Sequence, residues 1–421
     1  MRSYLVIFFF VASISIYAQV TDKISALDRM LLQGKYQNVI DSCRKTLVKD
    51  SLNAELYFKM GMALQNTLAE DEALSAFKKA VSLDSSSTNY KYILAKGYYS
   101  KSKNKLAEPI LANLYRNDTL NWTYAFHLTS IYMQNNRFDD AIRIYDRFLK
   151  KDTNNVYLDK KGFVMLKKGE YDIATELYEK SLKLKPDNTS AIKNLAFLYT
   201  ADNRPDTAVY ILTEGIGYDP DDMDLYARRA QINYARNYTK RALDDYMVIV
   251  GSGDSTELYL RRIGIGYCNN LQQNLAKKYL LLAYRKDSSQ SETCSYLGQT
   301  YYKLKDLKRS IYYYERVLKL LSPYNLTTRL TYILLAESLK EDRQYKNALN
   351  NYNKAQQIKI DPNIYWIMAN IYDEQMDDKK NAIRYYQLYL DNLKLAGGTV
   401  SLEAIEAIRK RMEFLKGNPV Q

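Results

Sequence analysis

Small and large apolar residues recur along this chain with a period of about 34 residues, from near residue 20 to near residue 395. One small position, called the marker here, identifies each of eleven repeats: Val39, Ala73, Ala107, Ala141, Ala174, Ala208, Ala242, Ala276, Ser310, Ala348 and Ala382. Eight of the ten intervals between markers are 34 residues, one is 33 and one is 38. Such a period is typical of a solenoid, in which each repeat buries its apolar face against its neighbours.

Within a repeat, the apolar positions predict two helices of about 14 residues joined by a short turn. The fifth repeat shows this most clearly, because Leu158, Gly162 and Met165 form one stripe with spacings of four and three. Gly169 then ends the first helix with a left-handed residue. Pro186 ends the second helix, because proline lacks the N–H group that a helix needs.

Two further positions of the repeat are regular: one holds a small residue and the other holds a large residue. Twelve before the marker stand Gly61, Ala95, Thr129, Gly162, Ala196, Ala230, Gly264, Gly298 and Ala336. Four after it stand Phe77, Leu111, Tyr145, Tyr178, Leu212, Tyr246, Leu280, Tyr314, Tyr352 and Tyr386. We expect the small residues to let the two helices approach closely, while the large residues fill the space around them. In repeat eleven, Ala369 and Tyr372 come one position early, which predicts an extra residue near 377–378.

This alternation resembles the tetratricopeptide repeat family over roughly residues 20–395. Residues 34–39 (GKYQNV) and 169–174 (GEYDIA) are similar to the turn of that family, and Pro186, Pro220 and Pro362 lie near its inter-repeat proline. The resemblance implies an all-α fold, an α-solenoid of about eleven helix–turn–helix repeats that forms a right-handed superhelix. It also implies that the first helices line the concave side.

The two ends of the chain differ from the repeats. Arg2 and the 12-residue apolar run at 5–16 predict a signal peptide over 1–18, since about 20 residues are needed to span a bilayer. A retained signal anchor is the alternative. We therefore expect an exported protein that is periplasmic, associated with the cell envelope or secreted. Residues 399–415 predict a helix that caps the last repeat.

The predicted organisation is a signal peptide at 1–18, repeats one to nine at 19–322, repeats ten and eleven at 323–395, and a capping helix and tail at 396–421. Two joints break the regular spacing. Residues 251–254 (GSGD) replace a tight turn, and 320–329 hold the four residues that lengthen one interval. We interpret both joints as hinges.

Composition adds a positive charge and three cysteines. The formal net charge of +13 is spread along the chain, which favours a solvated basic face, with attraction to a polyanion or an anionic membrane surface as the alternative. Cys43 occupies a core position, and Cys268 and Cys294 lie at different heights on neighbouring first helices. We expect all three to be buried thiols, because a disulfide requires Cα atoms within about 7 Å.

Catalytic chemistry finds little support, and we expect no catalytic residues, metal site or cofactor. His127 is the single histidine, so neither a histidine-based triad nor a multi-histidine metal site can form. Residues 264–266 (GIG) are half of a dinucleotide fingerprint but fall inside a predicted helix. The acidic pairs at 139–140, 221–222 and 244–245 are expected at helix starts or on exposed faces, where carboxylates are favourable.

The remaining candidate is the groove of the solenoid. Positions 18, 15, 11 and 8 before each marker share a helix face, rotated by about 110° from the core stripe. The candidates for partner binding on this face are Phe58, Met62, Tyr92, Tyr99, Phe126, Met133, Phe163, Phe197, Tyr234, Arg261 and Tyr302. Aromatic residues, methionine and arginine are enriched at interface centres, although these side chains could instead pack against the next first helix.

These observations predict a non-enzymatic scaffold that binds a protein or peptide partner in an envelope complex. The second hypothesis is electrostatic binding to a polyanion or a membrane surface, which salt would weaken because exposed charges are screened. Nucleic acid is not an expected partner. The pattern leaves the oligomeric state open.

Overall fold

The computed structural model describes residues 26–321, 325–396 and 402–417. Within these residues the chain consists of helices and turns, so the predicted all-α solenoid is confirmed. None of the described helices combines the length and the apolar character needed to cross a bilayer. The predicted signal peptide lies outside the described residues.

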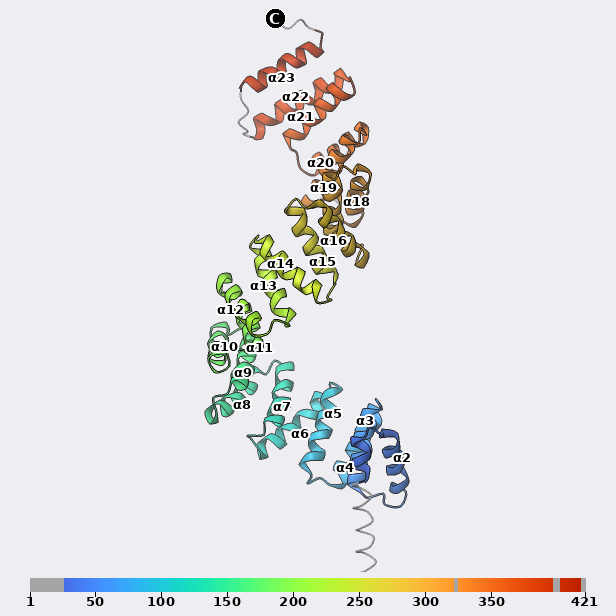
Figure 1. Cartoon of the computed structure of the whole chain (residues 1–421), viewed down its shortest axis with the longest axis vertical. Coiled ribbons are helices and arrows are strands. Elements are labelled where there is room, and N and C mark those ends of the chain that lie inside the picture. Colours follow the sequence, from blue (N-terminus) through green and yellow to red (C-terminus); the bar gives the residue numbers. More distant parts are fainter. Residues whose placement is uncertain (1–25, 322–324, 397–401, 418–421) are drawn as a thin grey trace, which may run out of the picture. The chain divides into compact units, whose positions relative to one another are not determined.

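The helices follow the predicted pairs, one pair to each repeat (Figure 1). Residues 26–32 are helical and precede α2 (Tyr36–Leu47) in repeat one. The next pairs are α3 (Ala54–Asn66) and α4 (Glu70–Leu83), α5 (Thr88–Ser100) and α6 (Asn104–Asn117), α7 (Trp122–Gln134) and α8 (Phe138–Lys151), α9 (Asn155–Lys168) and α10 (Tyr171–Leu184), α11 (Thr189–Ala201) and α12 (Pro205–Tyr218). They continue with α13 (Met223–Ala235) and α14 (Thr239–Gly251), α15 (Glu257–Asn269) and α16 (Gln273–Lys286), α17 (Ser291–Lys303) and α18 (Leu307–Leu320), α19 (Leu326–Glu341) and α20 (Tyr345–Ile358). Repeat eleven comprises α21 (Pro362–Asn370), the π-helical turn η1 (Ile371–Gln375) and α22 (Lys379–Ala396), and α23 (Leu402–Leu415) follows it.

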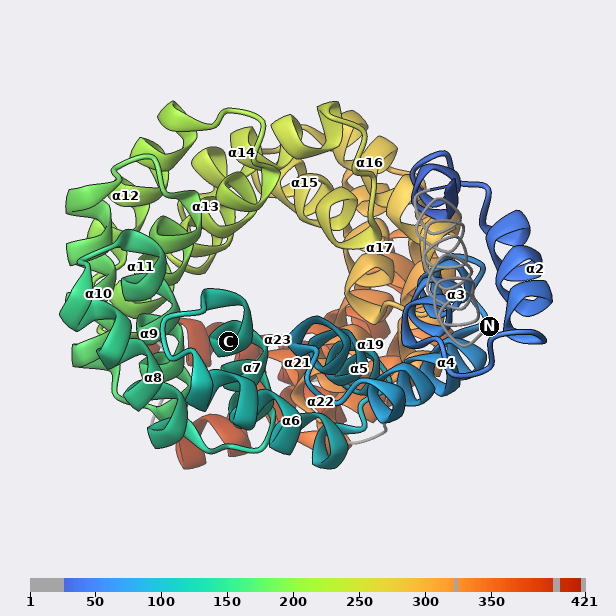
Figure 2. The same ribbon diagram turned by 90° about the horizontal axis from the view of Figure 1, so that it is seen from below.

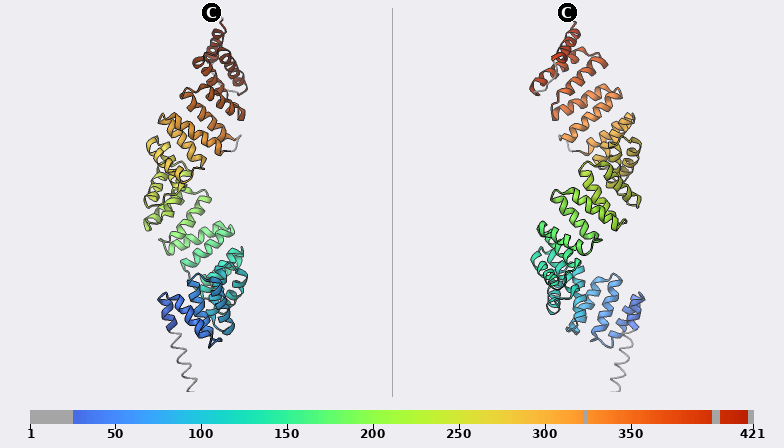
Figure 3. Two further views of the ribbon diagram at one scale, coloured as in Figure 1. Left: turned by 90° about the vertical axis from the view of Figure 1, so that its right-hand side faces the viewer. Right: turned by 60° about the vertical axis from the view of Figure 1, so that its left-hand side comes forward.

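The chain divides into two compact blocks, residues 1–198 and residues 199–421. Inside each block, consecutive helix pairs stack side by side (Figure 3). Figure 2 shows the first helices of the repeats on the inner side of each block, for example α7 and α9 in the first block and α13 and α15 in the second. The candidate groove residues are therefore carried by the inner helices.

Close contact between the small and large positions holds each repeat together. Every marker is at most 2% exposed. A Cβ atom added to Gly61 would lie 2.6 Å from the Phe77 ring, and one added to Gly298 would lie 2.8 Å from the Tyr314 ring. The small residue twelve before the marker thus makes room for the large residue four after it. This confirms the close approach that the sequence predicts.

A left-handed residue stands five positions before the marker in every repeat, although the sequence predicted one only at Gly169. These residues are Gly34, Leu68, Ser102, Asn136, Gly169, Asn203, Asn237, Leu271, Lys305, Arg343 and Asp377. The next N–H group reaches back to the first helix. For example, the N–H of Gln272 donates to the carbonyl oxygen of Tyr267 at 2.9 Å. This hydrogen bond ends the first helix and sets the direction in which the chain continues. The fold imposes the left-handed backbone conformation even on leucine.

Leu271→Gly is expected to raise the free energy of unfolding by about 0.5–1 kcal/mol. The left-handed conformation costs an L-residue about 1–2 kcal/mol, which glycine avoids while losing some backbone entropy. Leu271 has φ of 60° and is 78% exposed, so little packing is lost. Leu275→Gly, within α16, is the matched control and should cost about 1 kcal/mol. Urea unfolding followed by circular dichroism checks both, and equal losses in the two variants would refute the strain at Leu271.

The extra residue of repeat eleven lies earlier than predicted. The π-helical turn Ile371–Gln375 takes it up, rather than residues 377–378. The N–H of Asp378 consequently donates to the carbonyl oxygen of Tyr372, six residues back, at 2.8 Å. Asp377 keeps the left-handed conformation with φ of 49°. The turn is preserved because a π-bulge absorbs one residue inside a helix.

The capping helix is confirmed as α23. Met412 and Leu415 are buried, and Arg411 forms two hydrogen bonds with the Asp373 carboxylate, at 2.8 and 2.9 Å. The predicted hinge at 251–254 forms the end of α14 and the following turn, while residues 322–324 of the second hinge lie outside the described residues. Both hinges stay predictions.

Two predictions about polar and sulfur-containing side chains have different outcomes. The three cysteines are buried free thiols, as predicted. Asp245, in contrast, does not lie at a helix start or on an exposed face. It is buried within α14, where its carboxylate accepts two hydrogen bonds from Arg229, at 2.6 and 3.0 Å. The sequence pattern missed this pair because no other repeat has an acidic residue three positions after its marker, so the periodic pattern does not reveal it.

Candidate functional site

Three of the predicted groove residues expose large parts of their rings. Phe126 on α7 is 38% exposed, Phe163 on α9 is 41% exposed and Phe197 on α11 is 49% exposed. They come from the first helices of three consecutive repeats, and all three residues lie within the first block. Aromatic side chains gathered on one exposed surface are characteristic of binding sites. This row of phenylalanines is called the aromatic face below.

Two predicted residues next to this face surround the single histidine. The His127 ring lies 5.5 Å from the Tyr92 ring, 5.7 Å from the Tyr99 ring and 5.4 Å from the Phe126 ring, measured between centroids and with each pair close to perpendicular. Its Nδ1 atom lies 3.0 Å from the carbonyl oxygen of Thr123. His127 is therefore a packed side chain that holds Tyr92 and Tyr99 against α7.

Two lysine side chains from α9 lie over rings of the aromatic face. The Lys160 Nζ atom lies 5.5 Å from the centroid of the Phe126 ring, and the Lys167 Nζ atom lies 5.4 Å from that of the Phe163 ring. An ammonium group at this distance is attracted by the negative face of the ring. The sequence prediction omitted these lysines, although each is one position along the helix from a groove position.

Positive charge dominates α5 together with the three helices that carry the aromatic face. Helices α5, α7, α9 and α11 contain seven lysines, at 91, 96, 160, 161, 167, 168 and 193, and one carboxylate, Asp159. Asp159 accepts a hydrogen bond from Asn188 at 2.5 Å, and Lys161 and Lys168 pair with Asp146 and Asp139. Lys91, Lys96, Lys160 and Lys167 add positive charge to this surface.

The predicted groove residues of the second block bond mostly within the chain. Arg261 has a side chain only 11% exposed, and it pairs with Glu257 at 2.8 Å and also with Glu292. The Tyr302 hydroxyl donates to Glu341 at 2.8 Å, and burial together with that carboxylate raises the pKa of Tyr302 to about 12. Their polar groups are therefore used to join neighbouring repeats.

The other candidates, Tyr234, Phe58, Met62 and Met133, are half-buried. The Tyr234 hydroxyl accepts a hydrogen bond from Arg262 at 2.9 Å. Phe58 lies 4.6 Å from the Tyr90 ring, between centroids, and thus packs against the next first helix. Met62 and Met133 pack against the hydrophobic core. The structure brings together Tyr92, Tyr99 and the aromatic face, and it leaves the others as packing residues along the inner helices.

Comparison with protein families identifies the repeat. Four segments of the chain match models described as tetratricopeptide repeat: residues 54–87, 125–156, 165–242 and 291–323. One curated relative is the TPR repeat-containing protein MJ1428 of Methanocaldococcus jannaschii, 24% identical over 195 residues. That match covers 43% of this chain and 33% of the relative, so the chain spans about a third of the length of that protein.

Several solved structures are similar to this chain. One is the C-terminal part of a TPR repeat-containing protein from Cytophaga hutchinsonii, with 13% identity, 56% of this chain and 95% of that chain covered, and a TM-score of 0.45. The APC/C hetero-tetramer Cut9–Hcn1 has 14% identity, coverage of 92% and 95%, and a TM-score of 0.38. YrrB, described as a TPR protein with an unusual peptide-binding site, has 20% identity, coverage of 44% and 95%, and a TM-score of 0.36.

Proposed function

Because this chain belongs to the tetratricopeptide repeat family, we propose that it is a scaffold that binds a segment of a partner protein along the inner helices of its first block. The family match supports an interaction scaffold as the general role. The absence of catalysis stays a prediction.

The exposed aromatic face is the observation that carries the proposal. Phe126, Phe163 and Phe197 repeat once per first helix, so a partner lying across α7, α9 and α11 meets one ring per repeat. Covering such rings removes apolar surface from water at about 25 cal/mol per Å². Lys160 and Lys167 border the rings and favour carboxylates on the partner. The partner segment is therefore acidic and carries apolar or aromatic side chains.

The cell compartment is a second part of the proposal, and it rests on the sequence alone. The apolar run at 5–16 is too short to span a bilayer, and the small residue Ala18 after it offers a cleavage point, although Ile16 matches the usual cleavage pattern poorly. We infer that the mature scaffold works in the cell envelope, as a component of a complex there. Fusing residues 1–25 to a reporter enzyme that is active only outside the cytoplasm tests this inference, and a fusion protein that stays in the cytoplasm without reporter activity would contradict it.

Alanine at Phe126, Phe163 and Phe197 is expected to weaken partner binding by about tenfold for each ring, because buried aromatic anchors contribute most of the energy of an interface. Partners captured from envelope extract by the full chain are identified by mass spectrometry, and their affinity is measured by calorimetry. Tyr171→Ala and Tyr210→Ala are matched controls, since both tyrosines are exposed on second helices. A partner lost equally from the control variants would contradict the proposal.

Salt dependence separates this function from electrostatic binding. Exposed charges are screened within about 8 Å at physiological ionic strength, whereas contacts between buried rings are not. Groove binding should therefore lose less than about tenfold in affinity between low and physiological salt. If the affinity falls far more than tenfold with added salt and is unchanged in the alanine variants, the partner is instead a polyanion or a membrane surface.

A further inference from the structure

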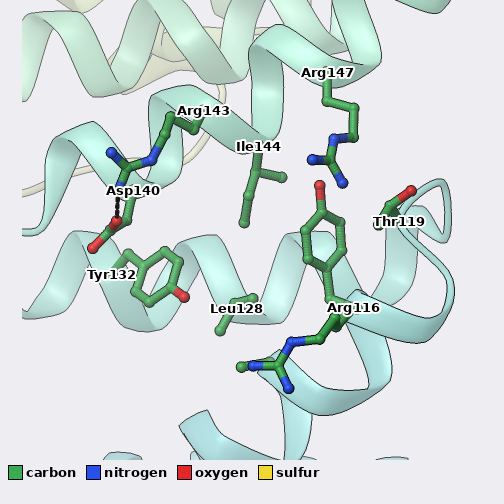
Figure 4. Close-up of a pocket in the computed structure, with 10 residues that line it drawn as sticks. Arg116, Thr119, Leu128, Tyr132, Asp140, Arg143, Ile144 and Arg147 are labelled. Carbon is green, nitrogen blue, oxygen red and sulfur yellow. Dashed lines mark hydrogen bonds and ion pairs between the residues drawn. The ribbon is translucent and has the colours of Figure 1, made fainter.

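A cavity of about 340 Å³ lies in the first block, on the side of the second helices and apart from the aromatic face. Residues of α6, α7 and α8 line it, with Leu128, Tyr132 and Ile144 providing apolar walls. Figure 4 shows Ile144 and Leu128 between two ends, one with Arg143 and Asp140 and the other with Arg147 and Thr119. A volume of this size accommodates a small molecule.

Repeat four lacks a tyrosine that three other repeats have beside the first helix. Three positions after the marker, repeats eight, nine and eleven have a tyrosine whose ring packs on a tyrosine of the first helix. These pairs are Tyr279 on Tyr267, Tyr313 on Tyr301 and Tyr385 on Tyr372, with centroid distances of 5.6, 5.6 and 5.3 Å. Repeat four has Ile144 there, and the face of Tyr132 is instead approached by Arg137 at 4.3 Å. The smaller side chain of Ile144 forms part of the apolar wall of the cavity.

Positive charge surrounds this space. Arg116, Arg143 and Arg147 line it, against one carboxylate, that of Asp140. Partial burial would raise the pKa of Asp140, but hydrogen bonds from Arg137 and Arg143 outweigh that effect and hold the pKa below its usual value. Asp140 is therefore ionised at neutral pH and neutralises part of the charge, while Arg116 and Arg147 remain to attract an anion.

A buried polar atom also lies in the wall. The hydroxyl oxygen of Tyr115 is buried, and burial raises the pKa of Tyr115 while Arg147 beside it lowers the pKa. The Arg147 guanidinium lies over the Tyr115 ring, 5.9 Å from its centroid. The Tyr115 hydroxyl group can donate its own hydrogen to a bound acceptor. The hydroxyl and the arginines together provide donors for one oxyanion.

We propose that this cavity binds a small molecule in which an oxyanion, a phosphate ester or a carboxylate, is attached to an apolar or aromatic body. The guanidinium groups hold the oxyanion, since their planar array of donors matches carboxylate and phosphate oxygens. The body lies between Leu128, Tyr132 and Ile144, in the place that tyrosine fills in the other three repeats. This site is independent of partner binding at the aromatic face.

Calorimetric titration of the full chain with phenyl phosphate, benzoate and inorganic phosphate tests the proposal. We expect saturable binding of phenyl phosphate or benzoate, at least about tenfold tighter than that of inorganic phosphate, which lacks the apolar body. The tighter of the two aromatic probes identifies the oxyanion. Absence of saturable binding for both aromatic probes, or equal binding of inorganic phosphate, would overturn the proposal.

Two variants test the assignment to this cavity. Ile144→Tyr should abolish binding, because it adds the ring that repeats eight, nine and eleven already contain. The exposed pair Arg116→Gln and Arg147→Gln should weaken binding by about tenfold or more, since a hydrogen bond to a charged group contributes about 1.5–3 kcal/mol. Arg285→Gln is the matched control, because Arg285 stands nine residues after its marker, as Arg116 does. Unchanged affinity in the arginine pair would overturn the assignment even if Ile144→Tyr failed to fold.

Discussion

Arg229→Ala is expected to lower the free energy of unfolding by about 3 kcal/mol. The Asp245 carboxylate has a side chain 5% exposed, and Arg229 is its ion-pair partner. Arg229 also donates to Thr213 on α12 at 2.9 Å, so its guanidinium joins three helices of the second block. Removal of one member of a buried pair costs about 3–5 kcal/mol because the other charge stays buried without compensation. The lower value applies here, since the Arg229 side chain is 19% exposed.

The destabilisation by Arg229→Ala should decrease as the pH falls. Burial raises the pKa of Asp245 even beside Arg229, whose hydrogen bonds act in the opposite direction. Without Arg229 the pKa rises further, so the folded variant takes up a proton at a higher pH than the unfolded chain does. A group with a raised pKa in the folded state favours folding as the pH decreases. Urea unfolding at about pH 8 and about pH 5 should therefore show the larger difference from wild type at pH 8.

Two further variants isolate the buried pair. Adding Asp245→Asn to Arg229→Ala should recover most of the lost stability, because the uncompensated charge disappears. Arg228→Ala removes the neighbouring arginine, whose pair with Asp224 is exposed, and should change stability by less than about 0.5 kcal/mol. If Arg228→Ala cost as much as Arg229→Ala, the loss would arise from helix α13 in general and not from the buried pair.

The spacing of small and large residues was sufficient to predict the helix pairs. Gly298 and Tyr314 are 16 residues apart, and their contact recurs in other repeats, so a periodic pattern reveals it. The left-handed residues were harder to predict, because only Gly34 and Gly169 carry the usual sequence signal. At Leu68 and Leu271 the backbone conformation is imposed by the packing of the two helices, and the residue type gives no indication of it.

The candidate site was only partly predictable for a related reason. The helical period places Phe58 and Phe126 on the same face, yet Phe58 packs on Tyr90 while Phe126 is exposed. The difference depends on which side chain the next first helix presents, and one repeat alone does not contain that information. The cavity beside Ile144 was missed because helices of two neighbouring repeats line it, and the pattern within one repeat does not show which of these side chains lie together.

Gly264→Ala is expected to lower the free energy of unfolding by about 2 kcal/mol, even though alanine favours a helix by about 1 kcal/mol. The added Cβ would lie 2.6 Å from the Leu280 Cγ atom and 3.0 Å from the Leu280 backbone nitrogen. A side-chain end could rotate away, but a backbone atom can move only if α15 and α16 separate.

Gly266→Ala on the same helix is the matched control for Gly264→Ala. Its Cβ would make ordinary contacts of 3.5 Å or more, so the helix preference of alanine should raise stability by up to about 1 kcal/mol. Urea unfolding of both variants should give changes of opposite sign. Since the helix preference is the same at the two sites, the difference between the variants measures the cost of pushing the two helices of repeat eight apart. Equal changes would mean that the small position twelve before the marker does not set the distance between the helices.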